Sequence, residues 1–510
     1  MPDARAAEVI ARYLERHRVA VFALFTVLVV VPIAIRAAAK PFWHDEIYTV
    51  LLAGLPSITS HWAAVRDGAD LAPPLNAFAT RGVKAVAGVG PVVTRIPPMI
   101  GFWTMTLVVF VTVRRRANTT YALAASCIPL FTSAYRYSYE ARPYGLMMGL
   151  AAVAWWSWAE AARGRGRGRC LPILGLSLAA GLWNHYYAVL AYAPMLIGEA
   201  VRSIRSRRID PGVFLAVAGS LLAAVPLLPL IRMLSAQASS FWARPTMADI
   251  PATYRFLFDS LNVAGFRWAI AVIALLVVIA SFRPAHQEPV TRQLPAHEIA
   301  AGLTCLLLPA LGALLGIMAT GVFVSRYALP AVAGASITIP LTIERLARRA
   351  RASELVLLAV MAGTYLGTLP SLRSVEPFEN PVAARSLLVG ALRMPGPTVA
   401  SGQLWYLQLW YYAPLELKSR LVYLADPESG LRYRGSDVFD RGYLALARWT
   451  PVTVEPFGPF TERHRAFRVY ASGAGWLLDR LRDEHAEISE LGNEPAGQLY
   501  EVSLAHQQKQ

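Results

Sequence analysis

The sequence predicts a polytopic α-helical membrane protein with a small α/β domain at its C-terminal end. Three observations predict it: a shortage of charged residues, a series of long apolar stretches, and a C-terminal region whose apolar stretches are too short to span. Of 510 residues, 55% are hydrophobic and 16% are charged, and the mean hydropathy is +0.41. Globular chains carry about 25% charged residues. This chain therefore has too little polar surface to coat a soluble body of its size.

Apolar stretches of spanning length account for most of the first 369 residues. A hydrocarbon core of about 30 Å is crossed by about 20 apolar residues in a helix, and about eleven stretches are interpreted as spans on this basis. They are residues 19–38, 96–113, 121–134, 144–161, 171–183, 186–200, 213–230, 268–282, 299–322, 328–343 and 355–369. Residues 73–87 are also apolar but contain Arg81 and Lys84, so an interfacial or re-entrant helix is expected there.

The basic residues predict the sidedness of the chain. The net charge is +16, and arginines gather in short runs at 114–116, 163–169, 202–208 and 345–351, each at the end of an apolar stretch. Cytoplasmic loops of membrane proteins carry such an excess of arginine and lysine. We therefore expect a multi-pass protein of the bacterial inner (plasma) membrane, with its N-terminus cytoplasmic and its C-terminal domain extracytoplasmic. A nucleic-acid partner is not expected, because predicted spans separate the basic runs.

Two domains are predicted from this pattern. Residues 1–369 form the transmembrane domain, with a long first external loop at 39–95 that includes interfacial helices. Residues 370–510 form a soluble extracytoplasmic α/β domain. Its expected elements are helices at 382–392 and 476–481, and strands at 420–424, 466–470 and 498–504. Alternation places Tyr500, Val502 and Leu504 on one face of the last strand.

The most informative polar residues follow the first predicted span. Asp45 and Glu46 lie beside Trp43 at the edge of the lipid, where adjacent carboxylates are costly unless they are paired or hydrated. One interpretation is a helix starting near Ile47, whose positive dipole end favours carboxylates. The other is a catalytic site in which a carboxylate is the general base and Trp43 stacks on a sugar or lipid. Asp70 is either an ordinary loop residue or a second carboxylate of the same cleft.

A short external loop between the third and fourth spans combines charges with tyrosines. It contains Arg136, Glu140 and Arg142 and is followed by Tyr144. Snorkelling arginines in an aromatic belt are one interpretation. A belt needs no Glu140, however, and arginines on the outer face oppose the positive-inside trend. Arginine binds phosphate through bidentate contacts, so a phosphate site is the alternative.

Two further groups are predicted on the same outer face. His185 and Tyr186 lie at the junction of the fifth and sixth spans, and Arg326 and Tyr327 precede the tenth. His185 is either part of the aromatic belt or, with outer carboxylates such as Glu140, a ligand of a metal site. Arg326 is either a snorkelling anchor or a phosphate ligand.

The chemistry is expected on the outer face, because the cytoplasmic loops carry neither a Walker loop nor a Gly-rich dinucleotide turn. Nucleotide donors are generally absent outside the cell. Acids, arginines and aromatics at the outer interface suit a lipid-linked phosphosugar donor instead. A carboxylate would deprotonate an acceptor hydroxyl, and arginines or a metal would stabilise the departing lipid phosphate.

These motifs resemble a known family. In order and sidedness the chain is similar to the GT-C glycosyltransferases, specifically the group of protein O-mannosyltransferases and lipid A aminoarabinose transferases. The similarity covers about residues 15 to 350 and rests on short motifs. They are Trp43-His44-Asp45-Glu46, Asp70 with Pro73-Pro74-Leu75, Arg95-Ile96-Pro97, Glu140-Ala141-Arg142-Pro143-Tyr144, His185-Tyr186-Tyr187, and Ser325-Arg326-Tyr327 with Pro330. The family often has His before the Pro-Pro pair, where this chain has Ala72.

The resemblance implies a function for the chain. It implies a GT-C-like fold, a polyprenyl-phosphate-sugar donor, inversion at the anomeric carbon, and Asp45 as catalytic base beside Glu46. It also implies that a divalent metal can bind near Glu140 and His185. The remaining substrate-binding candidates are Trp43, Asp70, Arg136, Arg142, Tyr144, Tyr186, Arg326 and Tyr327. The acceptor is a glycan, lipid or protein of the cell envelope, and the sequence identifies neither it nor the sugar.

Two other functions fit parts of the pattern. A ligase or polymerase that moves whole glycans from a lipid carrier would use similar chemistry. A transporter or flippase of a lipid-linked sugar would also have many spans. Transporters place ionisable residues near the bilayer midplane and show repeat symmetry, whereas the middles of these spans are nearly free of charge.

Overall fold

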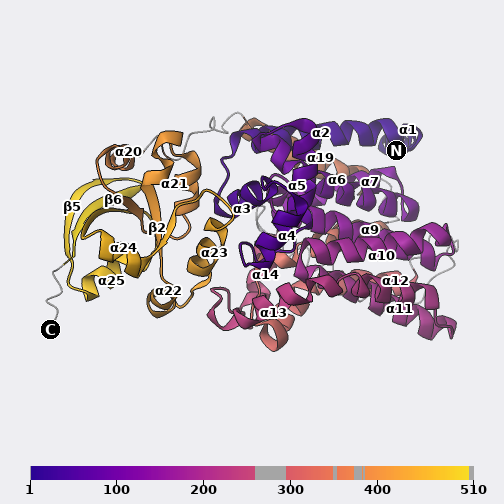
Figure 1. Ribbon diagram of the computed structural model, residues 1–510. Helices are drawn as coiled ribbons and strands as arrows, with labels where there is room; N and C mark the ends of the chain where they lie inside the picture. Colours follow the sequence, from indigo (N-terminus) through magenta and orange to yellow (C-terminus); the bar gives the residue numbers. More distant parts are fainter. Residues whose placement is uncertain (1, 259–294, 348–352, 373–381, 383–384, 505–510) are drawn as a thin grey trace. The chain divides into compact units, whose positions relative to one another are not determined.

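The described chain forms two compact units. The computed structural model describes residues 2–258, 295–347, 353–372, 382 and 385–504 (Figure 1). The first unit, called the helical unit, comprises Met1–Ala37, Val86–Leu228 and Pro245–Val375. The second, called the sheet unit, comprises Ala38–Ala85, Pro229–Arg244 and Glu376–Gln510. The sheet unit thus contains most of residues 39–95, the predicted first external loop, as well as the C-terminal region. The predicted domain division at residues 369 and 370 stays a prediction.

The helical unit contains no strand among its described residues. Its elements are α1 (Pro2–Arg16), α2 (Arg18–Ala39), α6 (Pro91–Arg116), α7 (Thr119–Cys127), η1 (Ile128–Phe131), α8 (Ser133–Tyr137), α9 (Tyr144–Ala162), α10 (Arg167–Asn184), η2 (Tyr186–Ala191), α11 (Tyr192–Ser206), α12 (Pro211–Leu222), η3 (Val225–Leu227), α14 (Asp249–Phe258), α16 (Ala296–Leu306), α17 (Leu308–Leu315), η6 (Gly316–Thr320), η7 (Ser325–Ala328), α18 (Ala331–Ala347), α19 (Ser353–Thr368) and η8 (Leu369–Leu372).

Three described helices are long and apolar enough to cross a membrane: Arg18–Ala39, Pro91–Arg116 and Pro211–Ala236. A fourth span is obtained if Ala296–Leu306 and Leu308–Thr320, bent by 56° at their junction, are counted as one. The expected number of about eleven is therefore not confirmed. Several expected spans form shorter or broken helices; residues 121–134, for example, are divided among α7, η1 and α8. The expected span at 268–282 lies outside the described residues.

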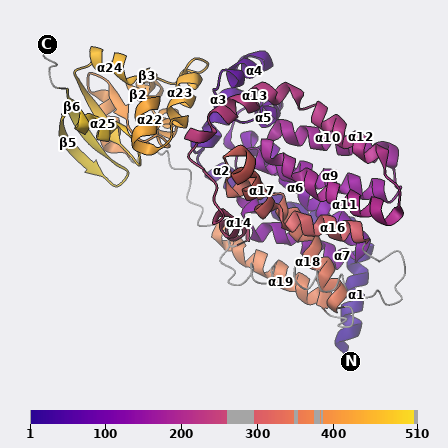
Figure 2. The same ribbon diagram turned by 90° about the horizontal axis from the view of Figure 1, so that it is seen from below.

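Small residues bring α6 and α9 into backbone contact. A Cβ atom added to Gly145 would lie 2.3 Å from the carbonyl oxygen of Pro98, and one added to Gly101 would lie 2.2 Å from that of Gly145. Helices approach this closely only where side chains are absent, and glycine and alanine are typical of such contacts in membrane proteins. The contact sets the start of α9, and therefore Tyr144, against α6. In Figure 2, α6, α9, α10 and α12 follow one another across this unit.

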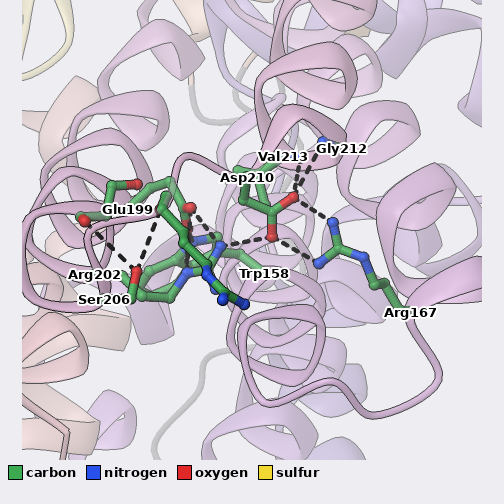
Figure 3. Close-up of polar contacts among 10 residues, drawn as sticks. Trp158, Arg167, Glu199, Arg202, Ser206, Asp210, Gly212 and Val213 are labelled. Carbon is green, nitrogen blue, oxygen red and sulfur yellow. Dashed lines mark hydrogen bonds and ion pairs between the residues drawn. The ribbon is translucent and has the colours of Figure 1, made fainter.

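Arginines of the basic runs pair with buried acids at the ends of these helices (Figure 3). Asp210, just before α12, accepts hydrogen bonds from Arg167 of α10 and Arg202 of α11. Glu199 accepts from Arg202 at 2.6 Å and from the indole nitrogen of Trp158 in α9 at 3.1 Å. The hydrogen bonds from Arg167 lower the pKa of Asp210 to about 2, although burial opposes this effect. These arginines thus tie α9, α10, α11 and α12 together.

The sheet unit combines helices from the region after α2 with the C-terminal region. Its elements are α3 (His44–Ala53), α4 (Ile58–Arg66), α5 (Leu75–Ala87), α13 (Leu228–Ala236), η4 (Ala238–Ser240), α20 (Ser386–Arg393), β1 (Thr398–Ala400), α21 (Tyr406–Tyr412), η9 (Leu415–Arg420), β2 (Leu421–Ala425), α22 (Pro427–Arg434), α23 (Val438–Ala447), β3 (Val454–Pro456), α24 (Phe457–Arg463), β4 (Ala466–Ala471), α25 (Leu477–Asp483), β5 (Glu487–Glu494) and β6 (Gly497–Ser503). Helix α5 occupies most of the stretch in which a short interfacial or re-entrant helix was expected.

A six-stranded sheet with the order β3-β2-β1-β4-β6-β5 organises this unit. Strand β1 is parallel to β2 and β4, strand β2 is also parallel to β3, and β6 runs antiparallel to β4 and β5. The predicted α/β character of the C-terminal region is thus confirmed. Val422 and Leu424 of β2 pack in the main core with residues of α24 and α25. Tyr423, between them, instead contacts Tyr406 of α21 and Tyr443 of α23.

The contact between α6 and α9 gives a prediction about stability. Gly145→Ala forces a methyl group against the backbone of Pro98, and overpacking of this kind costs about 1–3 kcal/mol. We expect a lower thermal unfolding midpoint for the purified full-length protein in detergent. Gly363→Ala is the matched control, because an added Cβ atom there meets nothing within 4 Å. Equal midpoints for the two variants would contradict the close approach.

Candidate functional site

Helix α3 presents the first pair of candidate carboxylates. The chain is extended at Trp43, with φ −96° and ψ 174°, and the helix begins at His44 rather than near Ile47. Asp45 and Glu46 therefore occupy the first turn, where the positive end of the helix dipole stabilises a carboxylate. The expected helix N-terminus is present, a few residues earlier than its expected position.

The two carboxylates occupy different environments. The side chain of Glu46 is fully buried; it accepts a hydrogen bond from the backbone N–H of Trp43 and forms an ion pair with Lys40, both at 3.4 Å. The side chain of Asp45 is 21% exposed. Glu46 thus stabilises the start of the helix, while Asp45 retains access to solvent or substrate. Of the two, Asp45 is better placed to exchange a proton.

Asp70 shapes the turn that leads to α5. One of its carboxylate oxygens accepts a hydrogen bond from the backbone N–H of Ala72 at 2.9 Å. This turn brings the chain to Pro73 and Pro74, which precede α5 directly. The structural role expected for a loop aspartate is therefore present, and the side chain is half-buried. Trp43, Asp45, Glu46 and Asp70 all belong to the sheet unit.

The helical unit gathers a second group of candidates, called the tyrosine–arginine cluster: Tyr144, His185, Tyr187, Arg326 and Tyr327. The Nε atom of Arg326 donates a hydrogen bond to the hydroxyl of Tyr144 at 2.7 Å, and its guanidinium lies 5.6 Å from the centre of that ring. The ring of His185 lies 4.6 Å from that of Tyr327 and 5.5 Å from that of Tyr144. Residues separated by about 180 positions in the sequence therefore form one aromatic and cationic group.

His185 is held in its neutral form. Burial lowers its pKa to about 3, and the positive charges of Arg142 and Arg326 add to this effect. Its Nδ1 atom accepts a hydrogen bond from the backbone N–H of Tyr187 at 3.1 Å, which places the proton of the neutral ring on Nε2. The ring can thus donate a hydrogen bond without adding a positive charge. Two arginines act electrostatically on this one uncharged group.

Glu140 pairs with Arg136 in the loop before α9. The carboxylate is 1% exposed and lies 3.1 Å from the Nε atom of Arg136, whose own side chain is 66% exposed. The backbone N–H of Arg142 donates to the carbonyl oxygen of Glu140 at 2.7 Å, which closes a tight turn. Glu140 therefore anchors an arginine that reaches toward solvent.

Glu140 and His185 fit a divalent metal poorly. Glu140 is engaged by Arg136, and the Nδ1 atom of His185 already accepts a hydrogen bond. The arginines near His185 would also repel a cation. Among the described residues, no group of three or more His, Cys, Asp or Glu side chains could hold a metal ion. We therefore assign no step of the reaction to a metal.

The structure also adds residues that were not selected from the sequence. Tyr187 lies 4.8 Å from Tyr327 between ring centres, and its hydroxyl contacts that of Thr320 at 2.7 Å. Tyr137 packs edge-on against Tyr144 at 5.0 Å. Tyr187 belongs to a motif recognised in the sequence and Tyr137 to the tyrosine-containing loop before α9, but periodicity does not show which tyrosines turn inward. Tyr186, which was selected, begins η2 and is half-buried.

Comparison with known proteins agrees with this architecture. Residues 72–230 match the family described as dolichyl-phosphate-mannose-protein mannosyltransferase. The matched region includes Glu140, Arg142, Tyr144 and His185, and Asp45 and Arg326 lie outside it. No curated protein matches the sequence.

Two solved structures share the fold over nearly the whole chain. ArnT from Cupriavidus metallidurans in its apo state superposes with a TM-score of 0.60 at 12% identity, covering 94% of this chain and 98% of that chain. The same protein bound to undecaprenyl phosphate gives a TM-score of 0.59 at 11% identity, covering 94% and 97%. The predicted resemblance to the GT-C glycosyltransferases is confirmed. At 11–12% identity the likeness to ArnT shows a shared fold and nothing more.

The poor fit of a metal gives a prediction. A ligand that binds only the folded state raises its unfolding temperature. We expect millimolar Mg²⁺, Mn²⁺ or Zn²⁺ to shift the thermal unfolding midpoint of the wild type no more than that of Glu140→Gln or His185→Gln. A shift in the wild type that both variants lack would show that these residues bind the ion.

Proposed function

We propose that this protein transfers a sugar from a polyprenyl-phosphate donor to a hydroxyl group of an extracytoplasmic acceptor, with inversion at the anomeric carbon. One observation carries the proposal: the positive charges of Arg142 and Arg326 both lower the pKa of the neutral, buried His185, which lies among the tyrosines of the tyrosine–arginine cluster. Such a group favours an anion, because arginines supply charge and His185 supplies a neutral donor. The lipid phosphate of the donor is the anion that we assign to it.

The comparisons support the choice of donor. ArnT, which shares the fold, has been solved with undecaprenyl phosphate bound, and the matching family is described by a dolichyl-phosphate-mannose donor. Both lipids are polyprenyl phosphates. We therefore propose that the donor here is a polyprenyl-phosphate sugar. The sugar, and whether the acceptor is a glycan, lipid or protein, are left open.

Asp45 is the proposed general base. It lies in the first turn of α3 with its side chain partly exposed, whereas Glu46 is buried against Lys40 and the backbone of Trp43. We assign proton transfer to Asp45 and support of the helix start to Glu46. Trp43 and Asp70 are proposed to line the acceptor or sugar site, because both are half-buried in the same loop.

The proposed reaction is a single displacement. Asp45 accepts the proton of the acceptor hydroxyl while the hydroxyl oxygen forms a bond to the anomeric carbon of the sugar. The bond between that carbon and the phosphate oxygen breaks, and the phosphate retains the electron pair. Arg142 and Arg326 stabilise the negative charge that develops on the departing polyprenyl phosphate. Arg136, whose side chain is largely exposed, is proposed to attract the phosphate of the incoming donor.

The proposed location follows from the positions of the arginine runs. We place the N-terminus in the cytoplasm and the reaction on the outer face of the bacterial inner membrane.

Substitution at the adjacent carboxylates tests the assignment. Asp45→Asn should lower kcat at least about 100-fold with little change in the KM for the donor, because general-base catalysis contributes about 10²–10⁴-fold. Glu46→Gln, the matched control, should lower the thermal unfolding midpoint but reduce kcat far less than Asp45→Asn does, because a glutamine can still accept the hydrogen bond from the backbone of Trp43. The kcat of each variant is measured as transfer of label from radiolabelled undecaprenyl-phosphate sugars, mannose first, to acceptors in membranes.

Other outcomes would reject the proposal. Full transfer by Asp45→Asn would contradict the assignment of the base. Movement of the label across the membrane without transfer would indicate a transporter. Transfer of preassembled glycans, with no transfer of single sugars, would indicate a ligase or polymerase.

A further inference from the structure

The loop that carries Asp45 is packed within the sheet unit at residues on both sides of Trp43. Phe42 and His44 are 6% and 4% exposed, whereas Trp43 and Asp45 are half-buried. The chain changes from extended to helical between these residues. Whatever holds Phe42 and His44 therefore determines where the first turn of α3, and with it Asp45, is placed.

His44 is inserted among aromatic side chains of α3 and α23. Its ring stacks on Tyr48 at 5.2 Å and on Tyr443 at 5.8 Å, and meets the ring of Phe439 edge-on at 5.4 Å. The Nε2 atom of His44 lies 3.4 Å from the hydroxyl of Tyr443, and its Nδ1 atom lies 3.9 Å from a carboxylate oxygen of Asp45. His44 is thus in contact with the C-terminal region on one side and adjacent to Asp45 on the other.

The hydroxyl of Tyr443 is held in place by the backbone that follows β1. It donates a hydrogen bond to the backbone carbonyl oxygen of Gln403, which follows β1. The side chain of Gln403 lies 3.4 Å from Asp440, and Asp440 also accepts hydrogen bonds from Trp476 at 3.0 Å and Tyr423 at 3.2 Å. Tyr443 and Asp440 are both fully buried. The residue that contacts His44 is therefore itself buried and hydrogen-bonded within the sheet unit.

A second attachment holds the residue before Trp43. The backbone N–H of Phe42 donates a hydrogen bond to the hydroxyl of Tyr412 in α21 at 2.7 Å. The ring of Phe42 also meets that of Tyr411 edge-on at 6.0 Å. Both partners come from one helix of the C-terminal region, and neither could be recognised from sequence spacing.

A third attachment lies farther along the same loop. The carboxylate of Asp67, just after α4, accepts hydrogen bonds from Arg448 at 2.9 Å and from the indole of Trp449 at 3.0 Å. These residues directly follow α23, the helix that carries Tyr443. The loop from Phe42 to Asp67 is therefore tied to the C-terminal region at both ends.

We infer that the C-terminal region of the sheet unit positions the candidate base Asp45, with Tyr443 as the positioning residue that acts through His44. The inference rests on the proposed function in naming Asp45 as the base, but the attachment of the loop does not. A catalytic group works only within a narrow range of positions, and a displacement of about 1 Å can cost about 100-fold in rate. The contacts of Phe42 and His44, on both sides of Trp43, can supply this precision.

Removal of one hydroxyl tests the inference in the full-length protein. Tyr443→Phe keeps the ring among its neighbours and loses the hydrogen bonds to Gln403 and His44. We expect faster backbone hydrogen exchange in peptides covering residues 41–53. We also expect kcat with undecaprenyl-phosphate mannose, or with whichever donor sugar the transfer assay identifies, to fall about tenfold while the KM for the donor stays unchanged.

Tyr470→Phe is the matched control. Tyr470 is also fully buried in the sheet unit, and its hydroxyl donates a hydrogen bond to Glu494 at 2.7 Å. Its hydrogen-bond partners among the described residues, Glu494 and Arg385, lie outside residues 41–53. It should lose comparable stability while exchange in residues 41–53 and kcat remain at wild-type values. A double variant adds a further check: Tyr443→Phe should have almost no effect on kcat in an Asp45→Asn background, because the two act on one step.

The outcomes separate this inference from the proposed function. Wild-type exchange in residues 41–53 and wild-type kcat in Tyr443→Phe would overturn the positioning role, and so would equal effects of Tyr443→Phe and Tyr470→Phe. Undiminished transfer by Asp45→Asn would instead overturn the assignment of the base. In that case the exchange comparison would still decide whether the C-terminal domain holds the loop.

Discussion

The cost of placing charge near lipid is the constraint on which this structure depends. A charged side chain at the bilayer must be paired, hydrated or turned toward a polar partner. The helical unit meets the constraint in two ways. Arg167 and Arg202 form ion pairs with Asp210 and Glu199, whereas Arg326 stacks on Tyr144 and hydrogen-bonds its hydroxyl. The first arrangement is electrically balanced and structural. The second lies beside a neutral histidine and suits an incoming anion.

The same principle separates the two acids of α3. Glu46 is fully buried and is paired with Lys40, so its charge is used to hold the start of the helix. Asp45, one residue earlier, keeps part of its surface exposed. A base must exchange its proton with substrate, so the partly exposed carboxylate is the one suited to catalysis. The buried acid and the C-terminal anchors on Phe42 and His44 then act as its support.

Much of this architecture could be predicted from the sequence, because hydrophobic runs and strand alternation are local signals. The expected first span at 19–38 corresponds to α2, and strands expected at 420–424, 466–470 and 498–504 correspond to β2, β4 and β6. Strands β1 and β3 were missed because three residues are too few to show a period. Strand β5 was also missed, because its residues are mostly polar and exposed and show no apolar alternation. The partner of His44 was missed for another reason: Tyr443 is 399 positions away, and no local pattern encodes that contact.

Candidate residues were recognised better than their roles. The sequence placed Arg142, Tyr144, His185 and Arg326 on one predicted face, and the structure joins them in the tyrosine–arginine cluster and its charge environment. The neutral state of His185 depends on burial and on neighbouring arginines, neither of which sequence spacing reveals. The metal was expected from residue types and from the family resemblance, neither of which shows that Glu140 pairs with Arg136 or that the Nδ1 atom of His185 accepts a backbone hydrogen bond.

The most direct test of the central claim is an experimental structure of the full-length protein with undecaprenyl phosphate bound. The account predicts that the phosphate lies within hydrogen-bonding distance of the guanidinium groups of Arg142 and Arg326. A phosphate bound elsewhere, for example at the arginine runs that we place on the cytoplasmic side, would contradict it.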